Sequence, residues 1–336
     1  MKILSYNIYG VKETKSPIPK WNIRQENIKR IINDLLKDDE IKVCCFQEVN
    51  QYNIDLLSEI LNDNDFKMLE KFPMKTESIY QYNIIAIKND SSININKVFC
   101  LPHGKDCEYK NINEQVIDYG MSDYRTTFFV DFEYRNKKYL IGCIHTDYIS
   151  TEGKINGTVK SLNYMDTIDV DYKIIIGDMN MVCHMSEVYN ILKQNNNYTT
   201  ISRSKKFNIS DNSWHGYGTK EQVNVDFAFI EKSMEEKYDY EIIKQDNMMD
   251  EGSDHRPIIL TIKENDKYWF IKEQNMKKIM KDLNKVQIIS YIILMIIDIY
   301  ILGSIDFVEH KIYGVLFVVI NSCLITLIKD SVKDKK

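Results

Sequence analysis

Six short segments place a polar residue that can bind a metal ion at the end of an apolar run or within one. Five of them end a run in this way: SYNI with Asn7, FQEV with Glu48, CIHTD with His145, IIIGDMN with Asp178 and Asn180, and GSDHRP with Asp254 and His255. The sixth, VNVDFAFI, holds Asp226 inside the run. A carboxylate within an apolar strand is costly unless it is paired or binds a cation. The shared pattern therefore predicts strands that converge on one polar cleft.

The chemistry that fits these side chains is hydrolysis of a phosphate ester. That reaction needs a hard divalent cation held by oxygen atoms, which carboxylates and amides supply. It also needs a group that positions or deprotonates water, and a donor for the charge that develops on the phosphoryl group. The sequence has no GxSxG elbow for a serine nucleophile and no P-loop. Metal-assisted attack by water is therefore the favoured hypothesis.

The order SYN, QE, H, GDxN, VDF and SDH resembles that of the endonuclease/exonuclease/phosphatase superfamily, whose members have a deoxyribonuclease-I-like fold. Each motif is short, and it is the complete set in this order that makes the resemblance specific. The resemblance covers residues 1–263, the length expected of the catalytic domain. It implies an α/β fold, a four-layer sandwich of two facing sheets with helices outside, and an active site at one end.

The resemblance also implies roles for the matched positions. Glu48 corresponds to the principal Mg²⁺ ligand, with Asn7 and Asp254 on the metal side, and Mn²⁺ is the other ion expected to serve. Asp178 corresponds to the residue that aligns or deprotonates the attacking water, and His255 to the catalytic histidine. Which of these two takes the proton stays open.

The remaining matched positions surround the phosphate. Asp226 would orient the catalytic histidine and fix its tautomer. Asn180 would hold the phosphate or the water, and His145 would donate to a phosphate oxygen, unless it is a core histidine with satisfied hydrogen bonds. Arg125, at the start of a strand, is either a phosphate contact or half of a surface ion pair. Gln81 stands near where some relatives have a carboxylate that pairs with the histidine at position 145, which implies less frequent protonation of that histidine.

Alternating apolar runs and helical stripes indicate the elements that position these residues. Strands are predicted at 1–9, 41–46, 83–88, 125–132, 138–144, 172–176, 223–230 and 257–262, and helices at 21–37, 54–61 and 187–192. Loops are predicted at 101–121 and 197–222. Strands with interspersed helices are typical of an α/β or α+β sandwich.

The composition changes near residue 264. A basic juxtamembrane linker, 264–285, precedes two apolar segments, 286–305 and 312–328, of which the first has a single charged residue, Asp298. As helices they would span about 30 and about 25 Å, against a hydrocarbon core of about 30 Å. We therefore predict a transmembrane hairpin of two helices. A pair of buried helices packed on the domain is the alternative.

Charge and cysteine content bear on location and partners. Lysines flank both ends of the predicted hairpin, which favours a multi-pass membrane protein with the catalytic domain and both termini in the cytoplasm. The seven cysteines form no CxxC pair, as expected of reduced thiols in a cytosolic domain. With 44 Lys and Arg against 49 Asp and Glu, the chain has no overall positive field to attract nucleic acid.

Three functions compete at this stage. The favoured one is a membrane-anchored phosphodiesterase that acts on a lipid head group such as that of sphingomyelin, similar to the neutral sphingomyelinases of this superfamily. The second is a Mg²⁺-dependent nuclease for DNA or RNA, which the negative charge weakens because duplex binding needs several phosphate contacts. The third is a membrane scaffold without activity, which the intact motifs disfavour. Beyond the phospholipid or nucleic-acid substrate and the membrane, no obligate protein partner is evident.

Overall fold

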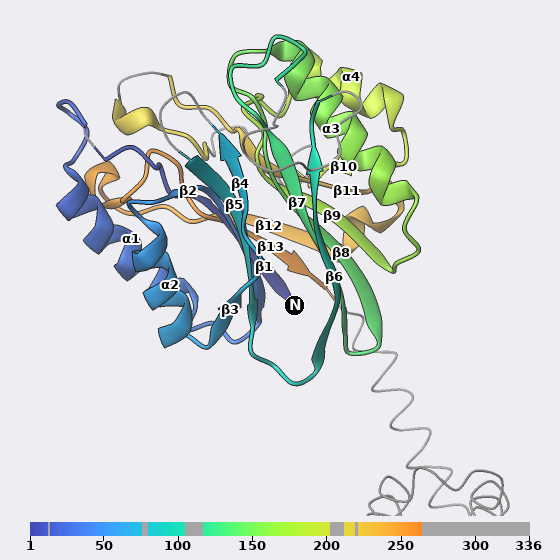
Figure 1. Ribbon diagram of the computed structural model, residues 1–336, viewed down its shortest axis with the longest axis horizontal. Helices are drawn as coiled ribbons and strands as arrows, with labels where there is room; N and C mark the ends of the chain where they lie inside the picture. Colours follow the sequence, from blue (N-terminus) through green and yellow to red (C-terminus); the bar gives the residue numbers. More distant parts are fainter. Residues whose placement is uncertain (13, 76–79, 105–116, 202–211, 219–220, 264–336) are drawn as a thin grey trace, which may run out of the picture. The chain divides into compact units, whose positions relative to one another are not determined.

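Two mixed β-sheets carry the described part of the chain (Figure 1). The computed structural model describes residues 1–12, 14–75, 80–104, 117–201, 212–218 and 221–263. The predicted linker at 264–285 and the predicted transmembrane helices at 286–305 and 312–328 lie outside these ranges. Within them, no helix combines the length and the apolar character needed to cross a membrane. Contacts join residues 1–264 into one compact unit.

The first sheet, called sheet A below, has the strand order β12-β13-β1-β2-β5-β3, with β4 also paired to β5. Its strands are β1 (Lys2–Asn7), β2 (Ile41–Asn50), β3 (Phe66–Met68), β4 (Phe72–Lys75), β5 (Tyr80–Lys88), β12 (Tyr238–Ile242) and β13 (Ile258–Ile262). The second, sheet B, has the order β10-β11-β9-β8-β7-β6. Its strands are β6 (Ile93–Pro102), β7 (Thr126–Tyr134), β8 (Lys137–His145), β9 (Tyr172–Asp178), β10 (Tyr198–Thr200) and β11 (Asp226–Glu231).

Alternation along the strands builds the layers. Val43 and Cys45 of β2 belong to the apolar core shared by the two sheets, whereas Cys44 and Phe46 belong to a second core under the helices α1 (Trp21–Leu35) and α2 (Ile54–Asp63). Successive side chains of a strand point to opposite faces, so one strand serves both cores.

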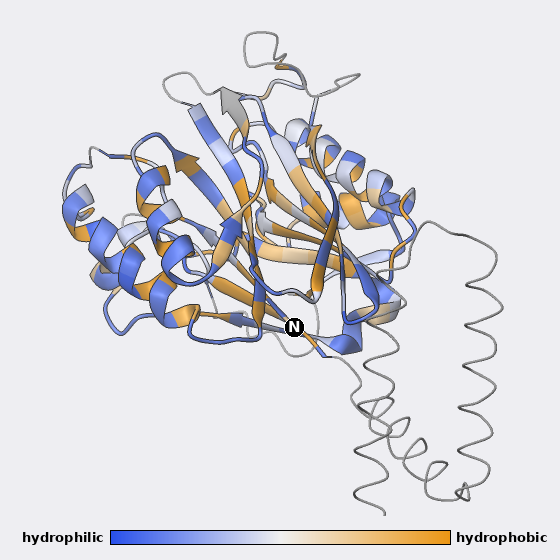
Figure 2. Ribbon diagram, turned by 60° about the horizontal axis from the view of Figure 1, so that its bottom comes forward, coloured by the Kyte–Doolittle hydropathy of each residue, from blue (hydrophilic) through white to orange (hydrophobic). Residues whose placement is uncertain are grey.

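The outer face of sheet B is covered in the same way. A third core lies under α3 (Thr151–Asp166) and α4 (Ser186–Gln194). Figure 2 shows the hydrophobic residues on the sheets and on the helix sides that face them. Each large side chain buried in these cores contributes about 1.5–3 kcal/mol. The predicted α/β sandwich is confirmed.

Strand direction brings the polar segments to one end. β1 and β2 are parallel, with Asn7 opposite Gln47, and β8 and β9 are parallel, with His145 opposite Asp178. Asp226, at the start of the antiparallel β11, is also opposite Asp178. β13 runs antiparallel to β1, so the chain leaves the last described strand at the other end of the sheets.

Some elements differ from the predictions. β3, β4, β6, β10, β12 and α3 were not predicted, and β10 lies inside the predicted loop 197–222. α3 buries Gly153, Gly157, Thr158 and Ser161 along with Leu162 and Met165. A helix that packs through small and hydroxyl-bearing residues shows no wide apolar stripe, so its periodicity is weak in the sequence. Ser150 caps it by accepting a hydrogen bond from the Gly153 amide at 3.0 Å.

Candidate active site

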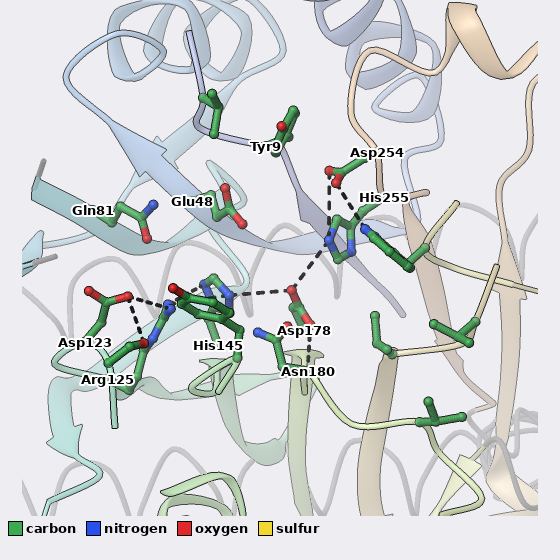
Figure 3. Close-up of a pocket in the computed structure, with 17 residues that line it drawn as sticks. Tyr9, Glu48, Gln81, Asp123, Arg125, His145, Asp178, Asn180, Asp254 and His255 are labelled. Atoms are coloured by element: carbon green, nitrogen blue, oxygen red, sulfur yellow. Dashed lines mark hydrogen bonds and ion pairs between the residues drawn. The ribbon is translucent and has the colours of Figure 1, made fainter. Parts of the chain in front are cut away.

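A pocket of about 640 Å³ opens at the end of the sandwich where these segments meet (Figure 3). Seven predicted site residues line it: Glu48, Arg125, His145, Asp178, Asn180, Asp254 and His255. The other two, Asn7 and Asp226, are buried and hydrogen-bonded to residues of the lining. The structure thus brings together all nine residues, which lie far apart in the sequence.

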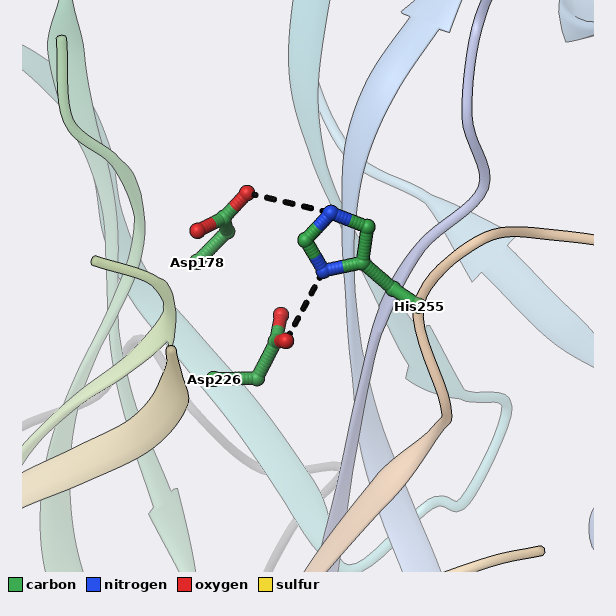
Figure 4. A group of neighbouring side chains, drawn as sticks. All are labelled: Asp178, Asp226 and His255. Carbon is green, nitrogen blue, oxygen red and sulfur yellow. Dashed lines mark hydrogen bonds and ion pairs between the residues drawn. The ribbon is translucent and has the colours of Figure 1, made fainter. Parts of the chain in front are cut away.

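His255 stands between two carboxylates (Figure 4). Its Nδ1 lies 2.8 Å from Asp226 Oδ2, and its Nε2 lies 3.7 Å from Asp178 Oδ2. Burial disfavours the imidazolium, but the two negative charges and the hydrogen bond from the ring to Asp226 outweigh it and raise the pKa of His255 well above its usual value. Ser253 fixes the backbone here, since its Oγ donates to the Asn7 carbonyl at 2.6 Å and accepts from the His255 amide at 3.1 Å.

Asp178 ends β9 and is held from both sheets. The Asn180 amide donates to its Oδ1 at 2.8 Å, and Asn7 Nδ2 donates to its Oδ2 at 2.9 Å. Burial, together with the charge of Asp226, raises the pKa of Asp178 to about 7 despite the nearby His255 and these hydrogen bonds. Because Asp178 Oδ2 and His255 Nε2 are only 3.7 Å apart, the charge of each group affects the protonation of the other.

Glu48 is fixed by its backbone and by two neutral donors. Its φ of 58° is unusual for a residue with a side chain. Its Oε1 accepts from Asn7 Nδ2 at 3.1 Å, and its Oε2 accepts from the Gly10 amide at 2.9 Å. A Cβ at Gly10 would lie 2.5 Å from the Glu48 carbonyl oxygen and 2.4 Å from Asn50 Nδ2, so this close approach requires glycine.

Asp254 offers an oxygen atom without a hydrogen-bond partner. Its Oδ2 accepts from Trp214 Nε1 at 3.0 Å, while its buried Oδ1 has no such partner. Burial raises the pKa of Asp254 despite the opposing charge of His255, whose Nε2 lies 4.0 Å from Oδ1, and the negative charge of Glu48 adds to the rise. A buried carboxylate oxygen next to a second carboxylate is the arrangement that a divalent cation stabilises.

The charge of the lining supports the same need for a cation. Four carboxylates line the pocket, from Glu48, Asp123, Asp178 and Asp254, against two cationic side chains, the Arg125 guanidinium and the His255 ring with its raised pKa. A phosphate ester would meet net negative charge here unless a cation were bound.

Two groups of side chains could hold that ion. Oxygen atoms of Asn7, Glu48 and Asp254 form the one predicted from the sequence. Asp178, Asp226 and His255 also offer ligand atoms within 4.8 Å of one another. His255 and Asp226 already share a 2.8 Å hydrogen bond between Nδ1 and Oδ2, so the first group fits the ion better.

Arg125 and His145 form the opposite side of the pocket. Arg125 Nη1 lies 3.1 Å from His145 Nδ1, and its Nη2 donates to Asp123 Oδ2 at 3.2 Å. Burial and the Arg125 charge lower the pKa of His145 well below its usual value, so its ring is neutral. An arginine only donates, so His145 Nδ1 accepts and its Nε2 carries the proton.

These contacts bear on two alternatives left by the sequence. Arg125 pairs with Asp123 inside the pocket and is 4% exposed, so the hypothesis of a surface ion pair is wrong. His145 is 3% exposed and contacts Arg125, but it also lines the pocket. Gln81 lines the pocket as well.

Sequence reasoning missed Asp123 and Trp214. Asp123 precedes a predicted strand by only two residues, and this offset from Arg125 was the available signal. Trp214 lies within the predicted loop 197–222, and its indole donates to Asp254, a carboxylate predicted on the metal side.

Comparisons with known proteins bear on the fold. No family model and no curated protein sequence matches the chain. Solved structures do match it. An endonuclease/exonuclease/phosphatase from Bacteroides vulgatus is similar with a TM-score of 0.63 and 14% identity, covering 78% of this chain and 98% of that one.

Two further structures have comparable scores. A mannosyl-6-phosphatase from Bacteroides thetaiotaomicron VPI-5482 has a TM-score of 0.59 and 11% identity, over 78% of this chain and 99% of that one. TDP2 from D. rerio, complexed with a single strand DNA product, has a TM-score of 0.58 and 12% identity, over 79% and 99%. At these identities the likeness establishes the fold. The sandwich predicted from the motif order is therefore that of the endonuclease/exonuclease/phosphatase proteins.

Proposed function

We propose that this chain, which has the fold of the endonuclease/exonuclease/phosphatase proteins, is a divalent-metal-dependent hydrolase of phosphate esters. One observation carries the proposal. His255, flanked by Asp226 and Asp178, faces the same pocket as Arg125 and a pair of carboxylates that calls for a cation. That combination offers an acid or base, an anion contact and a metal site within one cavity.

In this proposal Asn7, Glu48 and Asp254 hold the metal, with Mg²⁺ as the expected ion and Mn²⁺ as a substitute. The bound cation supplies charge neutralisation at the phosphoryl oxygens. The chain contributes the preorganisation: the Gly10 amide, the Asn7 amide group and the Trp214 indole hold the two carboxylates without neutralising them. None of these hydrogen-bond donors is charged, and the nearest cationic group, the His255 ring, is no closer than 4.0 Å to Asp254 Oδ1.

The proton chemistry falls to Asp178 and His255. The raised pKa of His255 keeps its ring protonated at neutral pH, and the pKa of Asp178, about 7, lets its carboxylate accept a proton from water there. Asn180 is held beside it, with its Nδ2 donating to the Thr146 carbonyl at 3.0 Å. Because the two groups are coupled, we assign the base to the pair.

The other side of the pocket stabilises the phosphoryl charge. Arg125 supplies a positive charge, and the neutral His145 supplies an Nε2–H donor that lies 3.5 Å from Asp178 Oδ2. Donors fixed before the substrate arrives lower the barrier without a reorganisation cost.

For the substrate we favour a phosphodiester of a lipid head group, such as that of sphingomyelin. The reasons are the predicted transmembrane hairpin and the predicted cytoplasmic placement of the catalytic domain. The second candidate is a nuclease, which the similarity to a TDP2 complexed with a single strand DNA product favours.

A side-by-side screen of the full chain tests the proposal. The substrates are sphingomyelin vesicles, phosphatidylcholine vesicles, single-stranded DNA, RNA and bis(p-nitrophenyl) phosphate, each with Mg²⁺ and with a chelator. We expect hydrolysis that the chelator abolishes, fastest on the lipid vesicles. A faster rate on DNA or RNA would select the nuclease instead.

A pair of histidine variants supplies the control. His255→Gln should abolish turnover, whereas His184→Gln, at an exposed histidine outside the pocket lining, should retain it. Absence of hydrolysis on every substrate by the wild-type chain would refute the enzyme and leave the inactive scaffold.

A further inference from the structure

Asp147 is a fully buried carboxylate that the chemistry above does not use. It lies two residues after His145, and its exposed fraction is 0%. No ion pair with a cation is found for it among the described residues. Burial opposes its ionisation, but hydrogen bonds from Ser150, Ser122 and Ile149 outweigh burial and lower the pKa of Asp147. A buried anion held only by neutral donors indicates a specific positional role.

The two oxygens of this carboxylate face two different loops. Oδ2 accepts from the Ser122 amide at 2.8 Å, from the Ser122 hydroxyl at 2.7 Å and from the Asp123 amide at 3.3 Å. Oδ1 accepts from the amides of Ile149 at 2.9 Å and Ser150 at 2.7 Å. Asp147 therefore joins the segment before β7 to the turn that begins α3.

A second contact strengthens the same junction. The Ser150 hydroxyl, which caps α3, donates to the carbonyl of Tyr119 at 2.5 Å. The segment between Tyr119 and Asp123 is thus attached to the end of β8 at several points. Little freedom remains for the residues that directly follow it.

Arg125 directly follows this segment and carries the only guanidinium of the pocket lining in the described structure. Asp123 accepts from Arg125 Nη2, and Arg125 Nη1 contacts His145, as Figure 3 shows. The chain of contacts begins at Asp147 and ends at His145, the last residue of β8, which precedes Asp147 by two residues. Asp147 consequently fixes both partners of Arg125, one through hydrogen bonds and the other through the backbone.

We propose that Asp147 is a positioning residue, which holds Asp123 and hence the Arg125 guanidinium in the orientation that receives a phosphoryl oxygen. The proposal rests on the proposed function in one respect, that Arg125 contacts the ester. Asparagine at this position keeps the shape but has a single acceptor oxygen. Its NH₂ group would face N–H donors, so one of the two loops would lose its hydrogen bonds.

The test is a double-mutant cycle with Asp147→Asn and Arg125→Ala, measured on bis(p-nitrophenyl) phosphate at saturating Mg²⁺. In the wild-type background, Asp147→Asn should lower kcat/KM about tenfold, chiefly through KM, because the guanidinium is misplaced. In the Arg125→Ala background the same change should cost less than about twofold, since the group it positions is absent. Equal losses in both backgrounds would overturn the proposal.

Asp171→Asn is the matched control. Asp171 accepts from the Lys138 amide at 2.9 Å and the Lys137 ammonium at 3.1 Å, at the end of sheet B away from the pocket. Its variant should keep the wild-type kcat/KM. A loss equal to that of Asp147→Asn would show that a general loosening of sheet B explains both.

A readout without catalysis separates this inference from the proposed function. In Asp147→Asn, amide hydrogen exchange in the segment 117–125 should accelerate, whereas in Asp171→Asn it should stay as in the wild type. Unchanged exchange in Asp147→Asn would show that Asp147 does not hold this segment, and the proposal would be wrong. If exchange does accelerate but the wild type hydrolyses no ester, only the proposed function fails.

Discussion

The two walls of the pocket differ in what they lack. The wall from sheet A presents Glu48 and Asp254, which are held by neutral donors, and one of the Asp254 oxygens has no hydrogen-bond partner. The wall from sheet B presents Arg125 and a neutral His145. The first wall is suited to a cation and the second to an anion. A phosphate ester with its metal would satisfy both walls at once, whereas either alone would satisfy only one.

The walls meet at two buried contacts. Asn7 Nδ2 of β1 donates to Asp178 Oδ2 of β9, and Nδ1 of His255, just before β13, faces Asp226 Oδ2 of β11. Each contact joins one sheet to the other. The spacing of the proposed metal and acid–base groups therefore depends on how the sheets pack, which the shared apolar core determines.

The largest effect is expected where the walls join. Asp178→Asn should lower kcat about 10³-fold, because an amide cannot accept the proton from water at neutral pH. Asp239→Asn, at an exposed partner of Lys263, is the control and should retain activity. The measurement is steady-state hydrolysis of a generic phosphodiester. A kcat within threefold of the wild type would remove Asp178 from the reaction.

Glu48→Gln should act on the metal requirement. Losing one carboxylate of the sheet A wall should raise the Mg²⁺ concentration for half-maximal activity about 30-fold, since the remaining ligands carry less negative charge. The titration is followed by initial rates, with the exposed Glu59→Gln as the matched control. An unchanged requirement for Mg²⁺ would mean that Glu48 is not a ligand, and Asp178 and Asp226 would then be the candidate ligands.

Arg125→Lys tests whether the walls are independent. Lysine keeps the charge but not the forked donors, so KM should rise about tenfold while the Mg²⁺ requirement stays constant. Initial rates over a range of substrate concentrations, each at several Mg²⁺ concentrations, measure both quantities. A joint shift in KM and in the Mg²⁺ requirement would mean that Arg125 affects binding of the ion, and the division into two walls would be wrong.

The sequence predicted this site better than it predicted the surrounding structure. Asn7, Glu48, His145 and Asp178 each follow an apolar run, and the end of a strand is where such a run stops. Their convergence could be expected from the fold implied by the motif order. The contact between Asn7 and Asp178 could not, because it depends on the packing of two sheets whose strands lie 171 residues apart.

What escaped prediction has a common physical cause. α3 packs through Gly153, Gly157 and Ser161, so its buried face is not apolar. Asp147 binds backbone amides of the segment that follows the predicted loop 101–121 and of the turn before α3, and such bonds leave no pattern of side-chain types. Strand ends are visible in a sequence because hydrophobicity marks them, whereas hydrogen bonds to the backbone are not marked in this way.

The smallest expected effect concerns the pH dependence of stability at the sheet B wall. The pKa of Asp147 is lowered in the folded chain, so its contribution is fully present above the unfolded value of about 3.9 and is lost as the pH falls through the folded value. Asp147→Asn should therefore lower the free energy of unfolding at pH 6.5, and this difference should shrink as the pH falls to 3. Urea unfolding at the two pH values measures it.

Asp171→Asn should show the same sign with a smaller change, because Asp171 is 39% exposed and water replaces its lost hydrogen bonds. A difference for Asp147→Asn that widens toward pH 3 would mean that the carboxylate is protonated in the folded chain, and Asp147 could not then accept from both loops.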